Sequence, residues 1–244
     1  MRPSRAAEPE RFFFVHMQKT GGTSLYTRTK RHFGEAGVYP NDSDGETWDV
    51  APNLMVPVLL ERWPERRDQI RLVGGHFPLC TRELLDAEFT TFTVLRDPVE
   101  RTLSYLRQHR ELNRTDWDRT LEEMYDDPAH LLHFRHFIGN HMVKMLTMWT
   151  EEMTDGMMTL VDLDRGRLEE AKEALEEMAE FGFQEDLEGF AQRLEQRWGW
   201  RLGGPRRDQP TAPVKVSRSL RRRIAEDTAL DRELYEHGRK LARR

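Results

Sequence analysis

Residues 14–25, Phe-Val-His-Met-Gln-Lys-Thr-Gly-Gly-Thr-Ser-Leu, combine the residue types that hold a phosphate group. The adjacent Gly21 and Gly22 let the backbone turn tightly and approach an anion closely. Where a helix begins, its first backbone N–H groups point outward and its dipole favours negative charge. Lys19 adds a positive charge, and hydroxyl donors come from Thr20, Thr23 and Ser24. The segment therefore predicts a phosphate-binding loop between a strand and a helix.

The order of residues in this loop separates it from two common nucleotide-binding loops. In the Walker A loop, G-x-x-x-x-G-K-[ST], the lysine follows the glycines, whereas Lys19 precedes Gly21 and Gly22. The segment also differs from the G-x-G-x-x-G pattern of dinucleotide-binding folds. A purely structural alternative stays open, in which the glycines serve packing and Thr23 and Ser24 cap a helix.

A second candidate anion site lies in residues 92–105, Phe-Thr-Val-Leu-Arg-Asp-Pro-Val-Glu-Arg-Thr-Leu-Ser-Tyr. Arg96 is predicted at the end of a strand, and Ser104 on the helix that follows it. Both side chains can then face the crevice outside the carboxyl ends of parallel strands, where open α/β sheets bind ligands. An arginine fork with a neighbouring hydroxyl suits a phosphate monoester. In the structural alternative, Arg96 and Asp97 only pair with each other and cap the helix.

The elements that position these residues follow from the apolar pattern. Short apolar or β-branched runs predict buried strands at 11–16, 71–75, 90–95 and 181–183. Helical spacing predicts helices at 24–33, 54–63, 98–110, 121–137, 141–149, 164–180, 187–198, 217–226 and 228–241. Pro64 is expected to break the second of these helices, and residues 35–53 are expected to be irregular.

This alternation predicts an α/β protein with a P-loop-like, three-layer fold. Its central, mostly parallel sheet is flanked by helices, and its C-terminal half is rich in helix. Residues 1–244 are expected to form a single domain, with residues 1–10 as a flexible lead-in.

Together, the two anion-binding segments resemble the sulfotransferases that use 3′-phosphoadenosine 5′-phosphosulfate (PAPS). The likeness is greatest to the group containing heparan and chondroitin sulfate sulfotransferases and many bacterial relatives. In that family K-T-G-G-T-S binds the 5′-phosphosulfate, and a later R-D-P-x-x-R-x-x-S-x-Y binds the 3′-phosphate. Softer likenesses occur at residues 75–78, Asn140, 181–194 and 230–237. The chain departs from the family at Gln18, where proline is usual, and at residues 184–186, which lack the usual threonine–glutamate pair.

The resemblance implies a sulfotransferase domain that moves a sulfuryl group from PAPS to an acceptor hydroxyl and releases adenosine 3′,5′-bisphosphate. The acceptor is then a glycan or a small metabolite, and the chemistry needs no metal. Lys19 is implied to act on the bridging and leaving oxygens, and Arg96 and Ser104 on the 3′-phosphate. The resemblance also implies that the 5′-phosphate is bound by the backbone and hydroxyl groups of Thr20, Gly21, Gly22, Thr23 and Ser24.

Two further groups of residues are candidates for this site. Arg206 and Arg207 follow two glycines and are candidates to close over the 3′-phosphate, with a solvated charge pair as the alternative. His76 is the candidate general base, because histidine titrates near neutral pH and His76 follows a predicted strand and two glycines. It also resembles the family's Gly-His segment, which holds a catalytic histidine in relatives that act on glycan uronic acids. A histidine satisfied by local hydrogen bonds is the alternative.

The other histidines are expected to have structural roles. His16 belongs to the loop and is expected to shape it. The spacing of His133, His136 and His141 invites a metal site, but surface or packing roles are preferred for them.

The composition carries no strong charge bias. The 244 residues include 38 basic and 43 acidic side chains, a net charge of −5, which gives no global attraction to nucleic acid or anionic membranes. Any anion site must therefore be a local concentration of donors. Cys80 is the single cysteine, which fits a reducing compartment. No apolar stretch approaches the roughly 20 residues that cross a bilayer, so a soluble, cytoplasmic protein is expected.

Two other function classes share these residues. A nucleotide-triphosphate-dependent small-molecule kinase would use a similar loop, although the position of Lys19 argues against it. A non-catalytic nucleotide-binding module would keep the fold without turnover. The sequence selects neither an acceptor nor an oligomeric state.

Overall fold

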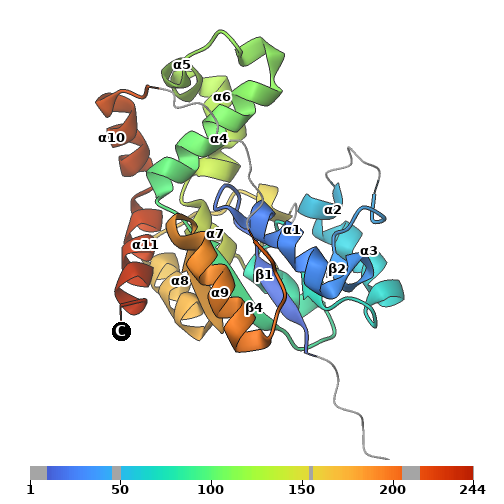
Figure 1. Cartoon of the computed structure of the whole chain (residues 1–244). Helices are drawn as coiled ribbons and strands as arrows, with labels where there is room; N and C mark the ends of the chain where they lie inside the picture. The colour runs from blue at the N-terminus through green and yellow to red at the C-terminus, as the bar shows by residue number, and fades with distance from the viewer. Residues whose placement is uncertain (1–9, 46–50, 154–155, 205–214, 244) are drawn as a thin grey trace, which may run out of the picture.

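Five parallel strands form the central sheet of the computed structural model, which describes residues 10–45, 51–153, 156–204 and 215–243 (Figure 1). The strands are β1 (Phe12–Val15), β2 (Val38–Tyr39), β3 (Leu72–Val73), β4 (Thr90–Leu95) and β5 (Glu180–Phe183). Their order is β2-β3-β1-β4-β5, and every pairing is parallel. The strand order therefore reverses at β1, and such a reversal opens a crevice at the carboxyl ends of the strands.

The side chains of β1 alternate between two buried faces of the sheet. Phe12 and Phe14 pack with apolar residues of α1 (Gly22–Phe33) and α9 (Leu187–Trp198), which cover one face (Figure 1). Phe13 and Val15 belong to the larger core on the other face. Because all four residues are buried, the expectation of a strand covered on both faces is confirmed.

Helices from the middle and end of the chain enclose the larger core. They are α3 (Val56–Arg66), α4 (Pro98–Leu112), α5 (Leu121–Asp126), α6 (Pro128–Ile138), α7 (His141–Thr147), α8 (Arg165–Glu177), α10 (Arg218–Asp227) and α11 (Ala229–Leu241). The short α2 (Ala51–Leu54) precedes α3. Layers of helix on both faces of a parallel sheet make this a three-layer α/β fold, as the sequence predicted.

Three sequence predictions about elements were wrong. The helix predicted at 121–137 is divided into α5 and α6, because Asp127 caps a new helix that begins at Pro128. Pro64 lies inside α3 and does not break it. Pro64 is exposed while Val56, Leu59 and Trp63 are buried, so the packed face outweighs the lost hydrogen bond. Residues 35–53 also contain regular structure, namely β2 and α2. A two-residue strand is too short to leave a period in the sequence.

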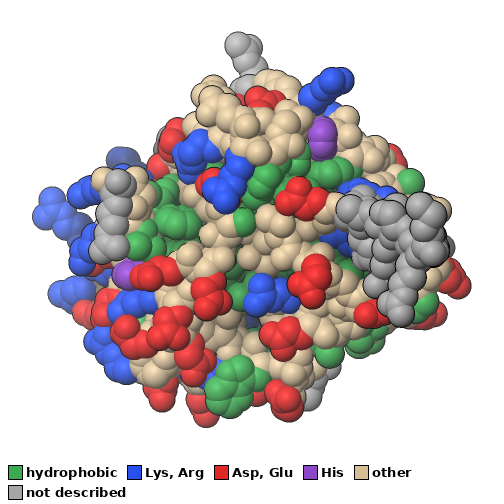
Figure 2. Space-filling view, turned by 90° about the horizontal axis from the view of Figure 1, so that it is seen from below, with side chains coloured by type: hydrophobic (Ala, Val, Ile, Leu, Met, Phe, Trp, Pro, Cys, Tyr) green, Lys and Arg blue, Asp and Glu red, His purple; other side chains and the backbone are tan. Residues whose placement is uncertain are grey.

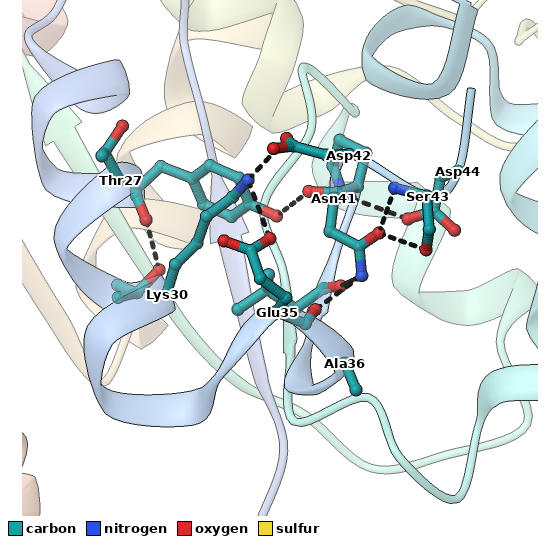
Figure 3. A network of polar contacts seen from close by, with 12 residues as sticks. Thr27, Lys30, Glu35, Ala36, Asn41, Asp42, Ser43 and Asp44 are labelled. Carbon is teal, nitrogen blue, oxygen red and sulfur yellow. Dashed lines mark hydrogen bonds and ion pairs between the residues drawn. The ribbon is translucent and has the colours of Figure 1, made fainter. Parts of the chain in front are cut away.

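The segment that follows α1 is held by a polar network (Figure 3). The Asn41 side chain donates to the Glu35 carbonyl at 2.5 Å and accepts from the Ser43 backbone at 2.8 Å. Lys30, in the last turn of α1, pairs with Glu35 and Asp42 at 3.1 Å each. These contacts fix the turn that leads from α1 through β2.

Charged side chains gather on the solvated helix faces. Figure 2 shows acidic and basic side chains interspersed on the face that it presents. No helix in the described part of the chain is both long enough and apolar enough to cross a membrane.

Candidate functional site

The loop between β1 and α1 lies at the carboxyl end of the central strand, next to α4 (Figure 1). Two of its residues adopt left-handed backbone conformations: Lys19 at φ 65° and Gly21 at φ 82°. Glycine takes this conformation without strain, whereas a lysine held there costs of order 1 kcal/mol. Arg96 Nη1 donates to the Lys19 carbonyl at 2.9 Å and so holds the loop in this shape.

Gly22 begins α1 because no larger residue fits there. A Cβ at this position would come within 2.2 Å of the His16 ring. That ring stacks on Phe14 with centroids 5.0 Å apart, and His16 Nδ1 bonds to the Gly74 carbonyl at 3.0 Å. His16 is buried and supports the loop from beneath, in the shaping role expected of it.

The start of α1 offers backbone donors to the solvent. Gly21 is its N-cap and makes no side-chain hydrogen bond to the first turn. The first N–H groups of a helix have no acceptor inside the helix, so those of Gly22, Thr23 and Ser24 are open to an anion.

A cleft of about 920 Å³ brings most of the sequence-predicted residues together. The predicted residues that line it are Lys19, Gly21, Gly22, Thr23, Ser24, His76, Arg96 and Ser104. Thr20 does not line it: this side chain is buried, and its hydroxyl donates to the Met17 carbonyl at 2.9 Å. Thr20 therefore stabilises the loop from inside. Arg206 and Arg207 lie outside the described residues.

One face of α4 supplies cleft residues that sequence reasoning missed. The missed residues are Arg107, Gln108 and Glu111, which follow the predicted Ser104 at helical spacing and also line the cleft. Gln108 Oε1 accepts a hydrogen bond from Lys19 Nζ at 3.1 Å, which fixes the ammonium group over the cleft. The spacing after Ser104 was the signal that could have identified these residues.

The cations of the cleft are partly desolvated. Burial, followed by the neighbouring Arg96 charge, lowers the pKa of Lys19. Burial also lowers the pKa of Arg96. The Nε atoms of Arg96 and Arg107 are buried and have no hydrogen-bond partner within the described part of the chain.

His76 enters the cleft as a neutral imidazole. Burial is the largest cause that lowers its pKa to about 4, and the Lys19 charge adds to it. Its Nδ1 lies 2.6 Å from the His16 carbonyl, which can only accept, so Nδ1 carries the proton. Nε2 is therefore the atom that can take a proton from a ligand.

Acid should destabilise this part of the molecule. Burial lowers the pKa values of His16, His76 and His141 below the ordinary value of 6.5. Between pH 6.5 and 4 the unfolded chain binds protons that the folded chain excludes, so the free energy of unfolding falls as the pH falls. The shift of His76 from 6.5 to about 4 corresponds to about 3 kcal/mol. Urea unfolding across this range measures the slope, and His76→Asn should reduce it; an unchanged slope in that variant contradicts the assignment.

Gln18 shows why this loop does without proline. The Gln18 backbone N–H points to Nε2 of the buried His141 at 3.5 Å, and a proline would offer no such donor. The Gln18 side chain lies against Met157 Sδ at 3.8 Å. The departure noted in the sequence therefore ties the loop to α7.

Arg101 belongs to the second anion motif but does not reach the cleft. It is fully buried and donates to the carbonyls of Phe137 and Ile138 at 2.8 and 3.2 Å. The carboxylate of Asp231 acts on Arg101 electrostatically and accepts the Met142 and Val143 N–H groups at 3.1 and 2.8 Å. This part of the motif holds the helices together, while Arg96 and Ser104 face the cleft.

Asn140 and Asp231 cap each other's helices. Asn140 Oδ1 accepts from the Leu230 and Asp231 N–H groups at 3.0 and 3.1 Å, at the start of α11. Asp231, in turn, caps the start of α7. Among the described residues, no group of three or more His, Cys, Asp or Glu side chains is arranged to hold a metal ion.

The topology and the cleft together define a three-layer α/β protein with a basic cleft at the carboxyl ends of its strands. Neither a protein-family model nor a curated protein matches this chain. We therefore infer the function from the geometry of the cleft.

Proposed function

We propose that this chain is a sulfotransferase that takes a sulfuryl group from PAPS and transfers it to an acceptor hydroxyl. The observation that carries the proposal is the pair of anion-binding groups facing one cleft. One group is the start of α1, and the other is formed by Arg96 and Ser104. Lys19 lines the same cleft. Two candidate phosphate-binding groups in one cleft suit a nucleotide that carries phosphates on both its 3′ and its 5′ oxygen.

The guanidinium groups of Arg96 and Arg107 support the same assignment, since both residues line the cleft. A nucleotide phosphate would accept hydrogen bonds from these guanidinium groups. Ser104 adds a hydroxyl donor from the next element. The residues present therefore fit adenosine 3′,5′-bisphosphate.

In the proposed reaction, each residue has one task. Lys19 Nζ, positioned by Gln108, stabilises negative charge on the bridging oxygen as its bond to sulfur breaks. His76 Nε2 accepts the proton of the acceptor hydroxyl as the new oxygen–sulfur bond forms. A pKa of about 4 makes His76 a weak base in the free protein, mainly because the ring is buried. The negative charge of the bound nucleotide offsets only the Lys19 charge, which is the lesser of the two causes that lower this pKa. The single, buried Cys80 fits the cytoplasmic setting that we propose.

Ligand-induced stabilisation tests this proposal. Saturating adenosine 3′,5′-bisphosphate should raise the melting temperature by about 5 °C or more, because only the folded state binds it. AMP, which lacks the 3′-phosphate, should give a smaller shift. Ser104→Ala should narrow the difference between the two ligands, whereas Arg197→Ala, outside the cleft, should not.

Equal shifts with AMP and the bisphosphate would remove the second phosphate site from the proposal. Stabilisation by magnesium-ATP in place of the bisphosphate would favour a kinase instead.

A further inference from the structure

The cleft has a part that the proposed nucleotide does not use. Setting aside the residues assigned to its phosphates and to the positioning of Lys19 leaves Gln18, Asn53, Leu54, His76, Glu111, Leu112 and Gln184. Gln18 belongs to the phosphate loop and Gln184 lies against Gly21, so we call the other five the acceptor group. His76 and Asn53 lie together, since the His76 N–H donates to the Asn53 carbonyl at 2.7 Å. Glu111 acts electrostatically on Lys19, so it stands near the proposed sulfuryl position. An acceptor hydroxyl must therefore approach past these side chains.

The place on α4 where Lys19 binds divides the cleft into the same two parts. Lys19 Nζ bonds Gln108, which lies one helical turn after Ser104 and one turn before Leu112. At 1.5 Å per residue, each of these neighbours is about 6 Å along the helix from Gln108. Ser104 marks the proposed nucleotide side of Lys19, and Leu112 marks the opposite side.

The charge of the acceptor group disfavours an anionic acceptor. Among the cleft residues that the structure describes, the cations are Lys19, Arg96 and Arg107, all of which we assign to the proposed nucleotide. The acceptor group adds the negative charge of Glu111. A carboxylate beside the reacting hydroxyl repels a polyanion and leaves a neutral molecule unaffected.

Exposed apolar side chains lie beside the two leucines of the acceptor group. Leu112 is 75% exposed, and Met55, next in the chain to Leu54, is 48% exposed. Trp117 is 58% exposed, and its indole N–H donates to the Glu111 carbonyl at 3.3 Å, which places it beside the end of α4. Large apolar side chains gathered at the mouth of a cleft mark a surface that a ligand covers.

We propose that the acceptor is an uncharged hydroxyl compound with an apolar portion next to its hydroxyl, and not a uronate-bearing glycan. This inference rests on the proposed function. The acceptor oxygen forms a bond to sulfur, the bond from sulfur to the bridging phosphate oxygen breaks, and the hydroxyl proton passes to His76. The apolar portion covers Leu54 and Leu112, and its burial supplies the binding energy that an anionic acceptor would draw from cations.

Three hydroxyl probes test the acceptor class with radiolabelled PAPS as donor. Octyl β-glucopyranoside and methyl β-glucopyranoside present the same free sugar hydroxyls with and without an alkyl chain, and a chondroitin oligosaccharide presents hydroxyls with carboxylates. We expect kcat/KM for the octyl glycoside to exceed that for the methyl glycoside by about tenfold or more, since burial of a few methylene groups is enough. The chondroitin oligosaccharide should be the poorest of the three.

Matched leucine variants locate the effect. Leu112→Asp should bring the octyl-to-methyl ratio close to one and leave the affinity for adenosine 3′,5′-bisphosphate within about twofold of the original. Leu84→Asp changes a leucine that is 41% exposed and does not line the cleft, so it should leave the ratio intact.

The outcomes separate this inference from the proposed function. A preference for chondroitin, equal rates for the two glycosides, or no transfer to any probe while the bisphosphate still binds overturns the acceptor class alone. Failure of the bisphosphate to bind overturns the sulfotransferase proposal itself.

Discussion

The Lys19→Ala variant is expected to lose about 100-fold or more in the rate of bisphosphate release from PAPS. Lys19 Nζ is held over the cleft by Gln108, where a positive charge stabilises the leaving oxygen most in the transition state. Removing one such group from an organised site costs about 10² to 10³ in turnover. Affinity for the bisphosphate should fall much less, because the start of α1 and Arg96 remain.

The matched control for this variant is Lys30→Ala. Lys30 also belongs to the phosphate-loop helix, but it pairs with Glu35 and Asp42 and does not line the cleft (Figure 3). Its rate should stay within about twofold of the original protein. A Lys19→Ala protein that keeps more than half of its activity would remove Lys19 from the chemistry.

Asp231→Ala should lower the free energy of unfolding by about 3–5 kcal/mol. The substitution removes the acceptor of the Met142 and Val143 N–H groups, and it leaves the fully buried Arg101 without its nearby carboxylate. An uncompensated buried charge is among the most costly changes a core can suffer. Urea denaturation followed by circular dichroism measures the loss.

Two further variants show how much of that loss comes from the charge of Asp231 and how much from its position in the core. Asp231→Asn keeps an acceptor oxygen and removes the charge, so its loss should be smaller than that of the alanine variant. Glu233→Ala changes a surface carboxylate of the same helix and should stay within about 0.5 kcal/mol. If the Asp231→Ala protein is as stable as the Glu233→Ala protein, the buried Asp231 and Arg101 do not stabilise the fold as we propose.

The sequence predicted the elements whose pattern is local. Residues 12–15 read as a strand because four apolar residues precede the loop, and α9 shows helical spacing along its whole length. Such patterns record which face of an element is buried, and the fold class follows from their order.

The sequence analysis assigned Arg96 to the anion site but found no role for Arg101, the second arginine of the same motif. Arg96 faces the cleft and Arg101 is buried, although the two lie five positions apart and share one residue type. The difference is set by α6 and by Asp231, which reach Arg101 from distant parts of the chain. The contact between Gln18 and His141 is equally non-local. Local periodicity contains no record of such pairs, so only the folded chain reveals them.

The exchange of caps between Asn140 and Asp231 has a consequence for synthesis on the ribosome. The start of α7 lacks its acceptor until residue 231 has left the exit tunnel, and α7 holds the Gln18 end of the phosphate loop through His141. The N-terminal half of the nascent chain therefore lacks this support of the loop, although it contains every residue that lines the cleft except Gln184. Folding of the loop should wait for the C-terminal helix, and ribosome-bound chains that stop before residue 231 should remain open to protease at the loop.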